Sequence, residues 1–186
     1  MPQKLTHSKL VILDRDGVIN HDSDHYIKSP DEWQPIPGSL EAIAKLNQAG
    51  YHIAVATNQS GIGRGLYDMD TLNAIHMKFH RLLAKVGGHV DAIFFCPHTD
   101  ADGCRCRKPL PGMIEQISQR YGVPIKGVPI VGDSVRDLVA GVSVGAEPHL
   151  VLTGKGEQAR ASGGLPPYTA IHQDLMAFVN HFIGRT

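Results

Sequence analysis

The sequence has 186 residues and a mass of 20.2 kDa, a length that is typical of one domain. Hydrophobic residues make up 42% of it and charged residues 19%, a composition that disfavours disorder. Eighteen Lys and Arg balance eighteen Asp and Glu, so the formal charge is zero. This balance excludes the basic excess typical of nucleic-acid-binding proteins, although it permits one local phosphate site. No apolar run approaches the ~18 residues of a membrane helix, so we expect no membrane association.

The N-terminal residues and the cysteine count predict a cytoplasmic protein. Only four strongly apolar residues, 10–13, precede Asp14, whereas a secretory signal needs a run of about 7–15. Three cysteines, an odd number, favour a reducing compartment over a disulfide framework. The neutral charge and the lack of a strong apolar stripe favour a monomer.

Five short apolar runs alternate with amphipathic stretches along the chain. Strands are predicted at 10–13, 52–56, 92–95, 128–131 and 149–152. Helices are predicted at 39–48, 71–86, 112–120, 135–144 and about 174–182. Near-continuous hydrophobicity is typical of parallel strands that are buried on both faces, and the alternation predicts right-handed crossovers. We therefore expect an α/β fold, a three-layer Rossmann-like sandwich with a central parallel sheet, formed by a single domain over residues 1–186.

Polar residues follow the predicted strands at the ends where ligands collect in parallel sheets. Asp14 and Asp16 follow the first strand, Thr57 follows the second and Asp133 follows the fourth. The third strand leads through an irregular loop, 97–109, to Lys108. A single strand-end aspartate is as often a helix N-cap, but four polar ends in this order favour one common site.

This set of residues fits metal-assisted phosphoryl transfer. Two unit charges about 4 Å apart repel by about 4 kcal/mol at an effective dielectric near 20, so a carboxylate that attacks a phosphate dianion needs cations nearby. Asp14 and Asp133 can hold Mg²⁺, and Lys108 adds a second cation. Thr57 can donate its hydroxyl to a phosphoryl oxygen. Asp16 can act as general acid and then as base, with a loop-capping role as its alternative.

A second cluster uses every cysteine of the chain and lies within the loop 96–106. Its members are Cys96, His98, Cys104 and Cys106. Three thiols and one imidazole suit a closed tetrahedral site for structural Zn²⁺, and the alternative is three reduced core cysteines beside a surface histidine. Because Cys106 directly precedes Arg107 and Lys108, a bound Zn²⁺ would also fix the backbone that carries the expected catalytic cation.

The motifs that contain these residues resemble those of the haloacid-dehalogenase-like phosphatases. The resemblance is carried by DRDGVIN at 14–20, TNQS at 57–60, Lys108 and GDSVRD at 132–137, and it spans about residues 10–155. It implies that Asp14 is the nucleophile that forms an aspartyl-phosphate. It also implies that Asp16 protonates the leaving oxygen and then activates water, and that Mg²⁺ is bound by Asp14, the Asp16 backbone carbonyl and Asp133.

Two further residues of the last of these motifs are Ser134 and Asp137. The resemblance implies that Asp137 orients Lys108 or a water on the metal. Close members have Lys where this chain has Ser134, so no metal role is transferred to that serine. The short separations between the motifs leave no room for a large cap domain.

The zinc loop is similar to that of two groups within the family. One removes the 7-phosphate of D-glycero-D-manno-heptose 1,7-bisphosphate, a precursor of lipopolysaccharide cores, and the other hydrolyses histidinol phosphate. Residues 20–33 look like the substrate flap of the first group, and 57–65 agrees, so we expect the heptose substrate. The expected substrate contacts are Asn20, Asp22, Tyr26, Asn58, Arg64 and Arg107. The guanidinium fork of Arg107 suits the second phosphate, and its alternative role is an exposed charge beside the zinc.

Hypotheses from other classes predict different behaviour. A receiver-type signalling domain that is phosphorylated on aspartate would share the strand-end aspartate, threonine and lysine, but it would not need Asp16 or the zinc cluster. A zinc-dependent interaction module would tolerate Asp14→Asn. A DNA 3′-phosphatase is disfavoured by the absence of a basic excess.

Overall fold

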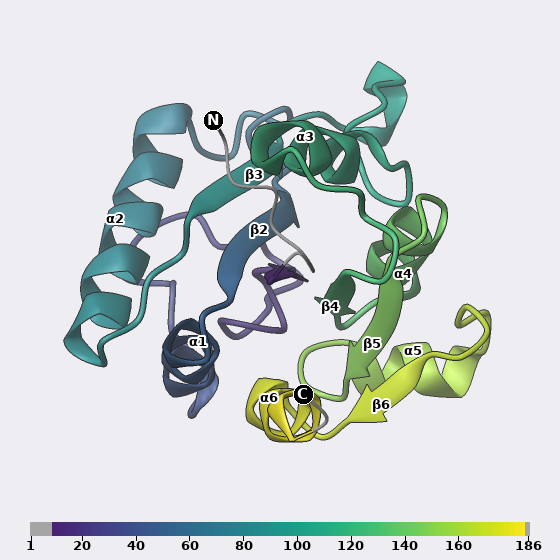
Figure 1. The fold of residues 1–186 in the computed structure, drawn as a ribbon. Coiled ribbons are helices and arrows are strands. Elements are labelled where there is room, and N and C mark those ends of the chain that lie inside the picture. The colour runs from purple at the N-terminus through teal and green to yellow at the C-terminus, as the bar shows by residue number, and fades with distance from the viewer. Residues whose placement is uncertain (1–8, 185–186) are drawn as a thin grey trace.

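Six parallel strands form one sheet in this computed structural model, which describes residues 9–184 (Figure 1). The strands are β1 (Leu10–Leu13), β2 (His52–Asn58), β3 (Ala92–Cys96), β4 (Pro129–Gly132), β5 (Glu147–Val151) and β6 (Ala170–His172). Their order across the sheet is β3-β2-β1-β4-β5-β6. Residues 1–8, on which the expectation about a secretory signal partly rests, lie outside the described range. The single domain over 1–186 likewise stays a prediction.

Helices cover both faces of the sheet. They are α1 (Ser39–Gln48), α2 (Met69–Lys85), α3 (Gly112–Tyr121), α4 (Val135–Val142), α5 (Gly156–Ser162) and α6 (Leu175–Ile183). One hydrophobic cluster joins the sheet to α1, α2 and α6, and a second joins it to α3, α4 and α5 (Figure 1). This arrangement confirms the predicted three-layer α/β sandwich.

Strand β1 shows why its sequence is apolar at every position. Val11 and Leu13 belong to the cluster under α1, α2 and α6, whereas Leu10 and Ile12 belong to the cluster on the opposite face. All four residues are at most 2% exposed. Successive side chains point to opposite faces of a strand, and both faces of this sheet are buried, so no position of β1 can be polar without cost.

The strand order reverses between β1 and β4. From β1 the chain moves outward to β2 and β3, and it then returns to β4 on the other side of β1. In open parallel sheets the carboxyl ends at such a reversal form a crevice for ligands. The first residue after β1 is Asp14, whose backbone N–H donates to the Val131 carbonyl of β4 at 2.9 Å.

Several elements differ from the sequence prediction. Strand β2 extends through Asn58, so Thr57 lies in the strand and not beyond it. Helix α2 begins at Met69, two residues early, because the Asp68 carboxylate caps it by accepting from the Thr71 N–H at 2.9 Å. Helix α5 and strand β6 were not predicted. Strand β6 has three residues at a sheet edge, and α5 buries only Gly156 and Ala159, so neither element shows a clear apolar period.

The two long connections that leave the sheet beside the reversal carry little regular structure. Residues 14–38 join β1 to α1, and residues 97–111 join β3 to α3 with only one short 3₁₀ helix, Asp100–Asp102. Neither connection contains an inserted cap domain, in agreement with the prediction. Among the helices of residues 9–184, none combines the length and the hydrophobicity needed to cross a bilayer.

Candidate active site

A cleft of about 240 Å³ opens at the carboxyl edge of the sheet, where the strand order reverses. Nine of the residues that the sequence assigned to catalysis, magnesium or substrate line this cleft. They are Asp14, Asp16, Asp22, Tyr26, Thr57, Asn58, Arg107, Lys108 and Asp133. Two expected substrate contacts, Asn20 and Arg64, are not among the lining residues. The loops 14–38 and 97–111 therefore place distant segments of the chain around one cavity.

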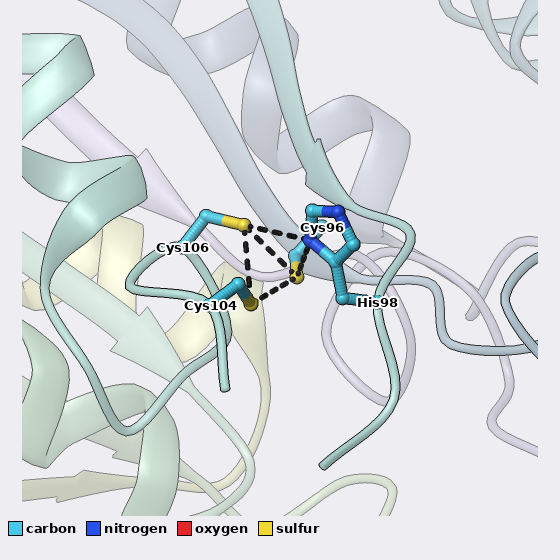
Figure 2. A group of neighbouring side chains, drawn as sticks. All are labelled: Cys96, His98, Cys104 and Cys106. Atoms are coloured by element: carbon cyan, nitrogen blue, oxygen red, sulfur yellow. Dashed lines mark hydrogen bonds between the residues drawn. The ribbon is translucent and has the colours of Figure 1, made fainter. Parts of the chain in front are cut away.

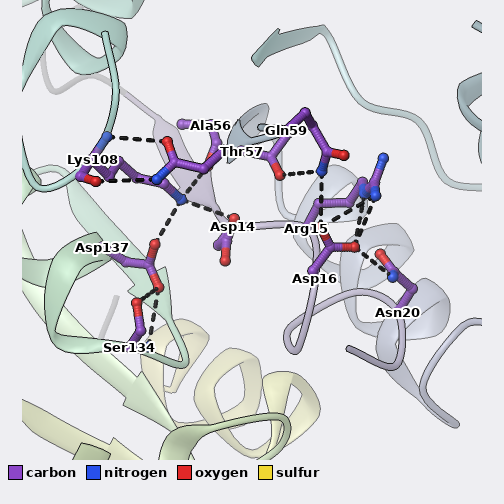
Figure 3. A network of polar contacts seen from close by, with 11 residues as sticks. Asp14, Arg15, Asp16, Asn20, Ala56, Thr57, Gln59, Lys108, Ser134 and Asp137 are labelled. Atoms are coloured by element: carbon purple, nitrogen blue, oxygen red, sulfur yellow. Dashed lines mark hydrogen bonds and ion pairs between the residues drawn. The ribbon is translucent and has the colours of Figure 1, made fainter. Parts of the chain in front are cut away.

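Lys108 lies at the floor of the cleft and is bound on three sides (Figure 3). Its Nζ is 2.9 Å from Asp14 Oδ1, 2.6 Å from Asp137 Oδ1 and 2.7 Å from the carbonyl oxygen of Ala56. Burial by itself would lower the pKa of Lys108, but the charges of Asp137 and Asp14 outweigh it and hold that pKa above its usual range. The side chain is therefore a fixed positive charge.

Three carboxylates converge beside this ammonium group. Ligand oxygens of Asp14, Asp133 and Asp137 all lie within 4.8 Å of one another. Burial and the neighbouring charge of Asp137 raise the pKa of Asp14 to about 7, and burial with Asp137 and Asp14 raises that of Asp133 to about 8. The repulsion shows that Lys108 alone does not neutralise the group. Clustered carboxylate oxygens are the ligands that Mg²⁺ prefers, so the donor set fits that cation.

Two glycines create the space that Asp133 occupies. A Cβ atom on Gly17 would lie 1.9 Å from Asp133 Oδ2, and one on Gly154 would lie 2.2 Å from the same oxygen. Both glycines have positive φ, of 84° and 56°. The backbone N–H of Lys155 also donates to Asp133 Oδ2 at 2.8 Å. The carboxylate is thus held by backbone from β1's loop and from the loop after β5.

Asp137 contacts Lys108, and it also caps the helix that follows. One of its oxygens binds Lys108, as described above, and the other accepts from the Ser134 N–H at 3.1 Å and from its hydroxyl at 2.7 Å. The second contact is a capping box at the start of α4. Ser134 therefore fixes Asp137, which in turn fixes Lys108.

Asp16 lies on the other side of Asp14, within a network of donors (Figure 3). Arg15 Nη2 and Asn20 Nδ2 donate to Oδ1 at 2.9 and 2.8 Å, and Gln59 Nε2 donates to Oδ2 at 2.8 Å. Burial would raise the pKa of Asp16, but the Arg15 charge and these hydrogen bonds lower it below its usual value. Asn20 is fully buried behind Asp16, so the structure gives it a supporting contact where the sequence had suggested a substrate contact.

Asn58 binds the backbone that carries Lys108. Its Nδ2 donates to the Lys108 carbonyl and its Oδ1 accepts from the Lys108 N–H, each at 3.1 Å. The two bonds use the amide oxygen and one amide hydrogen. Asn58 thus fixes the position of Lys108 from the end of β2, in addition to lining the cleft where the sequence expected a substrate contact.

The outer wall of the cleft comes from the loop 14–38. Lys155 Nζ lies 3.3 Å from Asp22 Oδ2 and 3.1 Å from Asp24 Oδ1, and these ion pairs join that loop to the segment after β5. Tyr26 lines the cleft with a φ of 66°, a backbone region that non-glycine residues rarely occupy. Arg64 is exposed and lies outside the lining. No pattern in the sequence indicates the Lys155 contact, because its partners are more than 130 residues away.

Arg107 reaches the cleft from the zinc loop. Its Nε donates to Asp100 Oδ1 at 2.5 Å, and its side chain is 12% exposed. Its Nη1 is buried and has no hydrogen-bond partner within residues 9–184. A buried guanidinium donor without a partner is costly, and an anion in the cleft would satisfy it.

The cysteine and histidine side chains of the loop 96–106 face one point (Figure 2). Cys96 Sγ lies 3.6 Å from Cys104 Sγ and 3.2 Å from Cys106 Sγ, and His98 Nδ1 lies 3.3 Å from Cys106 Sγ. Zn–S bonds of about 2.3 Å in a tetrahedron imply S···S separations of roughly 3.8 Å. The four ligand atoms surround a space that approaches these dimensions, and the three cysteines form no disulfide. The donor set therefore fits Zn²⁺.

Comparison with known proteins agrees with this geometry. Residues 4–145 match the family model of haloacid dehalogenase-like hydrolases. The D-glycero-beta-D-manno-heptose-1,7-bisphosphate 7-phosphatases of Bordetella bronchiseptica and Pseudomonas putida are 58% and 54% identical, over 94% of this chain and 98% and 99% of theirs.

A solved structure gives the same result. The crystal structure of the D,D-heptose 1,7-bisphosphate phosphatase of B. bronchiseptica, complexed with magnesium and phosphate, superposes with a TM-score of 0.94 at 57% identity. The match covers 95% of this chain and 99% of that one. With its strand-end carboxylates and buried lysine in one cleft, the chain belongs to the haloacid dehalogenase-like hydrolases.

Proposed function

We propose that this protein is a Mg²⁺-dependent phosphatase that removes the 7-phosphate of D-glycero-D-manno-heptose 1,7-bisphosphate. The observation that carries the proposal is the contact between Lys108 and Asp14 beside two further carboxylates, at the floor of a cleft that admits a small molecule. The substrate is inferred from relatives that bear this name and match nearly the whole chain.

In the first step, Asp14 attacks the phosphorus atom of the 7-phosphate. A bond forms between an Asp14 carboxylate oxygen and phosphorus, the bond between phosphorus and the sugar oxygen breaks, and that oxygen takes a proton from Asp16. In the second step, Asp16 takes a proton from water, the water oxygen bonds to phosphorus, and the aspartyl-phosphate bond breaks. The products are the heptose 1-phosphate, with a free hydroxyl group at carbon 7, and inorganic phosphate.

The residues around Asp14 make this attack feasible. Lys108 lowers the charge repulsion between the carboxylate and the phosphoryl group, and Thr57 can donate to a phosphoryl oxygen from the end of β2. Asp14, Asp133 and the Asp16 carbonyl, with Asp137 close by, would hold Mg²⁺, which would add positive charge near the phosphoryl oxygens.

A panel of phosphorylated substrates tests the proposal. Phosphate release with Mg²⁺ is measured for both anomers of the heptose 1,7-bisphosphate, hexose bisphosphates, histidinol phosphate and a 3′-phosphorylated oligonucleotide. We expect the highest kcat/KM for a heptose bisphosphate, with loss of the 7-phosphate only. Faster hydrolysis of histidinol phosphate or of the oligonucleotide would contradict the assigned substrate.

Arg107→Ala is expected to weaken the distinction between bisphosphate and monophosphate substrates. If the unpaired Nη1 binds the second phosphate, the variant raises KM for the bisphosphate by roughly 10–100-fold, as loss of a charge-assisted hydrogen bond of about 1.5–3 kcal/mol implies. Heptose 7-phosphate should be affected less than about threefold. The matched control is Arg105→Ala, since Arg105 is exposed and pairs with Glu115. Equal losses on both substrates would show that Arg107 does not bind the second phosphate.

Removal of Zn²⁺ is expected to lower turnover while leaving Mg²⁺ affinity nearly unchanged. Cys106 precedes Arg107 and Lys108, and Arg107 pairs with Asp100 of the same loop, so release of the cluster loosens the backbone that carries both cations. The Asn58 bonds still hold part of the Lys108 backbone, and we therefore expect a loss of kcat and not inactivation. Metal content, kcat and the Mg²⁺ concentration for half activity are compared before and after chelation. Unchanged kinetics in a protein verified to lack zinc would contradict this coupling.

Three further expectations from the sequence remain predictions. These are a monomeric state, a cytoplasmic location and the absence of nucleic-acid and membrane partners. Size-exclusion chromatography with light scattering would test the first of them directly.

A further inference from the structure

Gln59 connects two groups of the proposed reaction although it carries no reactive atom itself. Its Nε2 lies 2.8 Å from Asp16 Oδ2 and 2.9 Å from Thr57 Oγ1 (Figure 3). We propose that Gln59, held in turn by Tyr67, is a positioning residue that aims the Asp16 carboxyl group and the Thr57 hydroxyl at the transferring phosphate. This inference rests on the proposed function and assigns how its proton donor is held.

The hydrogen-bond chemistry fixes the orientation of the Gln59 amide. An ionised carboxylate can only accept, so the amide nitrogen must face Asp16, and its two hydrogens are then shared between Asp16 and Thr57. The remaining group, Oε1, accepts from the Tyr67 hydroxyl at 2.5 Å. A flipped amide would place its oxygen against the carboxylate and would leave Tyr67 facing the NH₂ group. Gln59 and Tyr67 are 4% and 9% exposed, so water cannot readily replace these bonds.

The same bonds determine where the Thr57 proton points. A hydroxyl has one hydrogen, and Thr57 Oγ1 already accepts a hydrogen from Gln59. Its own hydrogen is therefore free to reach an acceptor in the cleft, which Thr57 lines. Gln59 in this way prepares Thr57 to donate to a phosphoryl oxygen without any rearrangement when substrate binds.

Asp16 is supported from the opposite side by Arg15. The fully buried guanidinium donates to Asp16, and its Nη1 lies 3.2 Å from His76 Nε2 of α2, which must accept because arginine has no acceptor. Burial and the Arg15 charge lower the pKa of His76 to about 3, which keeps its ring neutral. Arg15 thus contacts both oxygens of Asp16, Oδ1 at 2.9 Å and Oδ2 at 3.2 Å, and Gln59 adds the shorter contact to Oδ2, at 2.8 Å.

The test compares two leaving groups in Gln59→Leu, which removes the amide at similar volume. A sugar alkoxide needs a proton from Asp16 in order to leave, whereas p-nitrophenolate leaves without one. Because kcat/KM includes only the steps up to departure of the leaving group, lost alignment of Asp16 lowers it for the heptose bisphosphate alone. Lost alignment of Thr57 lowers kcat/KM for both substrates, because both carry the phosphoryl oxygen to which Thr57 donates. We expect a loss of about 100-fold for the sugar phosphate and about 10-fold or less for p-nitrophenyl phosphate.

Tyr67→Phe removes one hydroxyl and keeps the ring, so it provides a second variant if Gln59→Leu does not fold. We expect a smaller loss in the same direction, about 10-fold for the sugar phosphate and at most about 3-fold for the aryl phosphate. Tyr51→Phe, partly buried beside Phe182 at the margin of the core, is the control and should change neither value. Equal losses on the two substrates would overturn the positioning of Asp16, and no loss on either would overturn the positioning role as a whole. Failure of the unaltered protein to release phosphate from the heptose bisphosphate would overturn the proposed function instead.

Discussion

Asp14→Asn should abolish phosphate release. An uncharged amide cannot form the proposed acyl-phosphate, and loss of a nucleophile in an enzyme of this type costs on the order of 10⁴-fold or more in kcat. The measurement is single-turnover phosphate release with Mg²⁺ and the heptose bisphosphate. In parallel, acid-quenched unaltered protein should carry a phosphoryl adduct on the peptide that contains Asp14, detected by mass spectrometry. The variant should carry none. Retained turnover would show that another group is the nucleophile.

The same variant should be at least as stable as the unaltered protein in buffer free of Mg²⁺. Burial and the Asp137 charge raise the pKa of Asp14 to about 7 from an ordinary 3.8, so above that pH the ionised carboxylate favours the unfolded chain. Replacing it with a neutral amide removes this repulsion. Asp70→Asn, at an exposed position of the first turn of α2, is the control. A large fall of Tm at pH 8 would mean that the Asp14 ion pair with Lys108 stabilises the fold more than burial and the Asp137 charge destabilise it.

Lys108→Met should impair both stability and catalysis. Met fills a similar volume, but the variant leaves Asp14 and Asp137 facing each other in a buried site without the ammonium group between them. Removing one partner of a buried ion pair costs about 3–5 kcal/mol of unfolding free energy. Loss of one preorganised charge from the phosphoryl site lowers kcat by roughly 10²–10³-fold. Denaturant unfolding and steady-state kinetics with the heptose bisphosphate measure the two effects.

The destabilisation by Lys108→Met should depend on pH in a defined direction. Without the ammonium group the pKa of Asp14 rises further above 7, and at pH 5.5 the carboxyl group is protonated and uncharged. The difference in unfolding free energy should therefore be larger at pH 8 than at pH 5.5. Lys85→Met, an exposed change in the last turn of α2, should cost less than about 0.5 kcal/mol at either pH. An equal cost at both pH values would indicate lost packing and not lost charge.

The charges at the floor of the cleft explain why the site is suited to a divalent cation and an anionic substrate together. Asp14, Asp133 and Asp137 carry three negative charges when ionised, and Lys108 supplies one positive charge. A divalent ion would bring the group to neutrality. The second phosphate of a bisphosphate then needs another cation, and Arg107 lines the cleft where it can provide one.

Much of the architecture follows from the pattern of apolar residues. The continuous hydrophobic run of β1 requires burial on both faces, which only a parallel sheet between helix layers provides. Once the sheet is parallel, every strand ends at the same edge, so Asp14, Thr57 and Asp133 lie at that edge. The cysteine and histidine spacing is similarly local, because Cys96 and Cys106 are only ten residues apart. These features were predictable since each depends on neighbours in sequence or on strand direction alone.

The contacts that orient the reactive groups could not be predicted in this way. Asn20 looked like a substrate contact, but it lies buried behind Asp16. Gln59 belongs to the TNQS motif, but the motif does not show that its amide contacts Asp16, and no pattern points to Tyr67. These contacts come from where the turn after β2 places the two residues. Apolar periodicity and strand direction, which one sequence reveals, set the fold and the set of residues at the cleft. The direction of each hydrogen bond depends on distances of tenths of an ångström between segments far apart in the chain, and these arise only when the loops pack against one another.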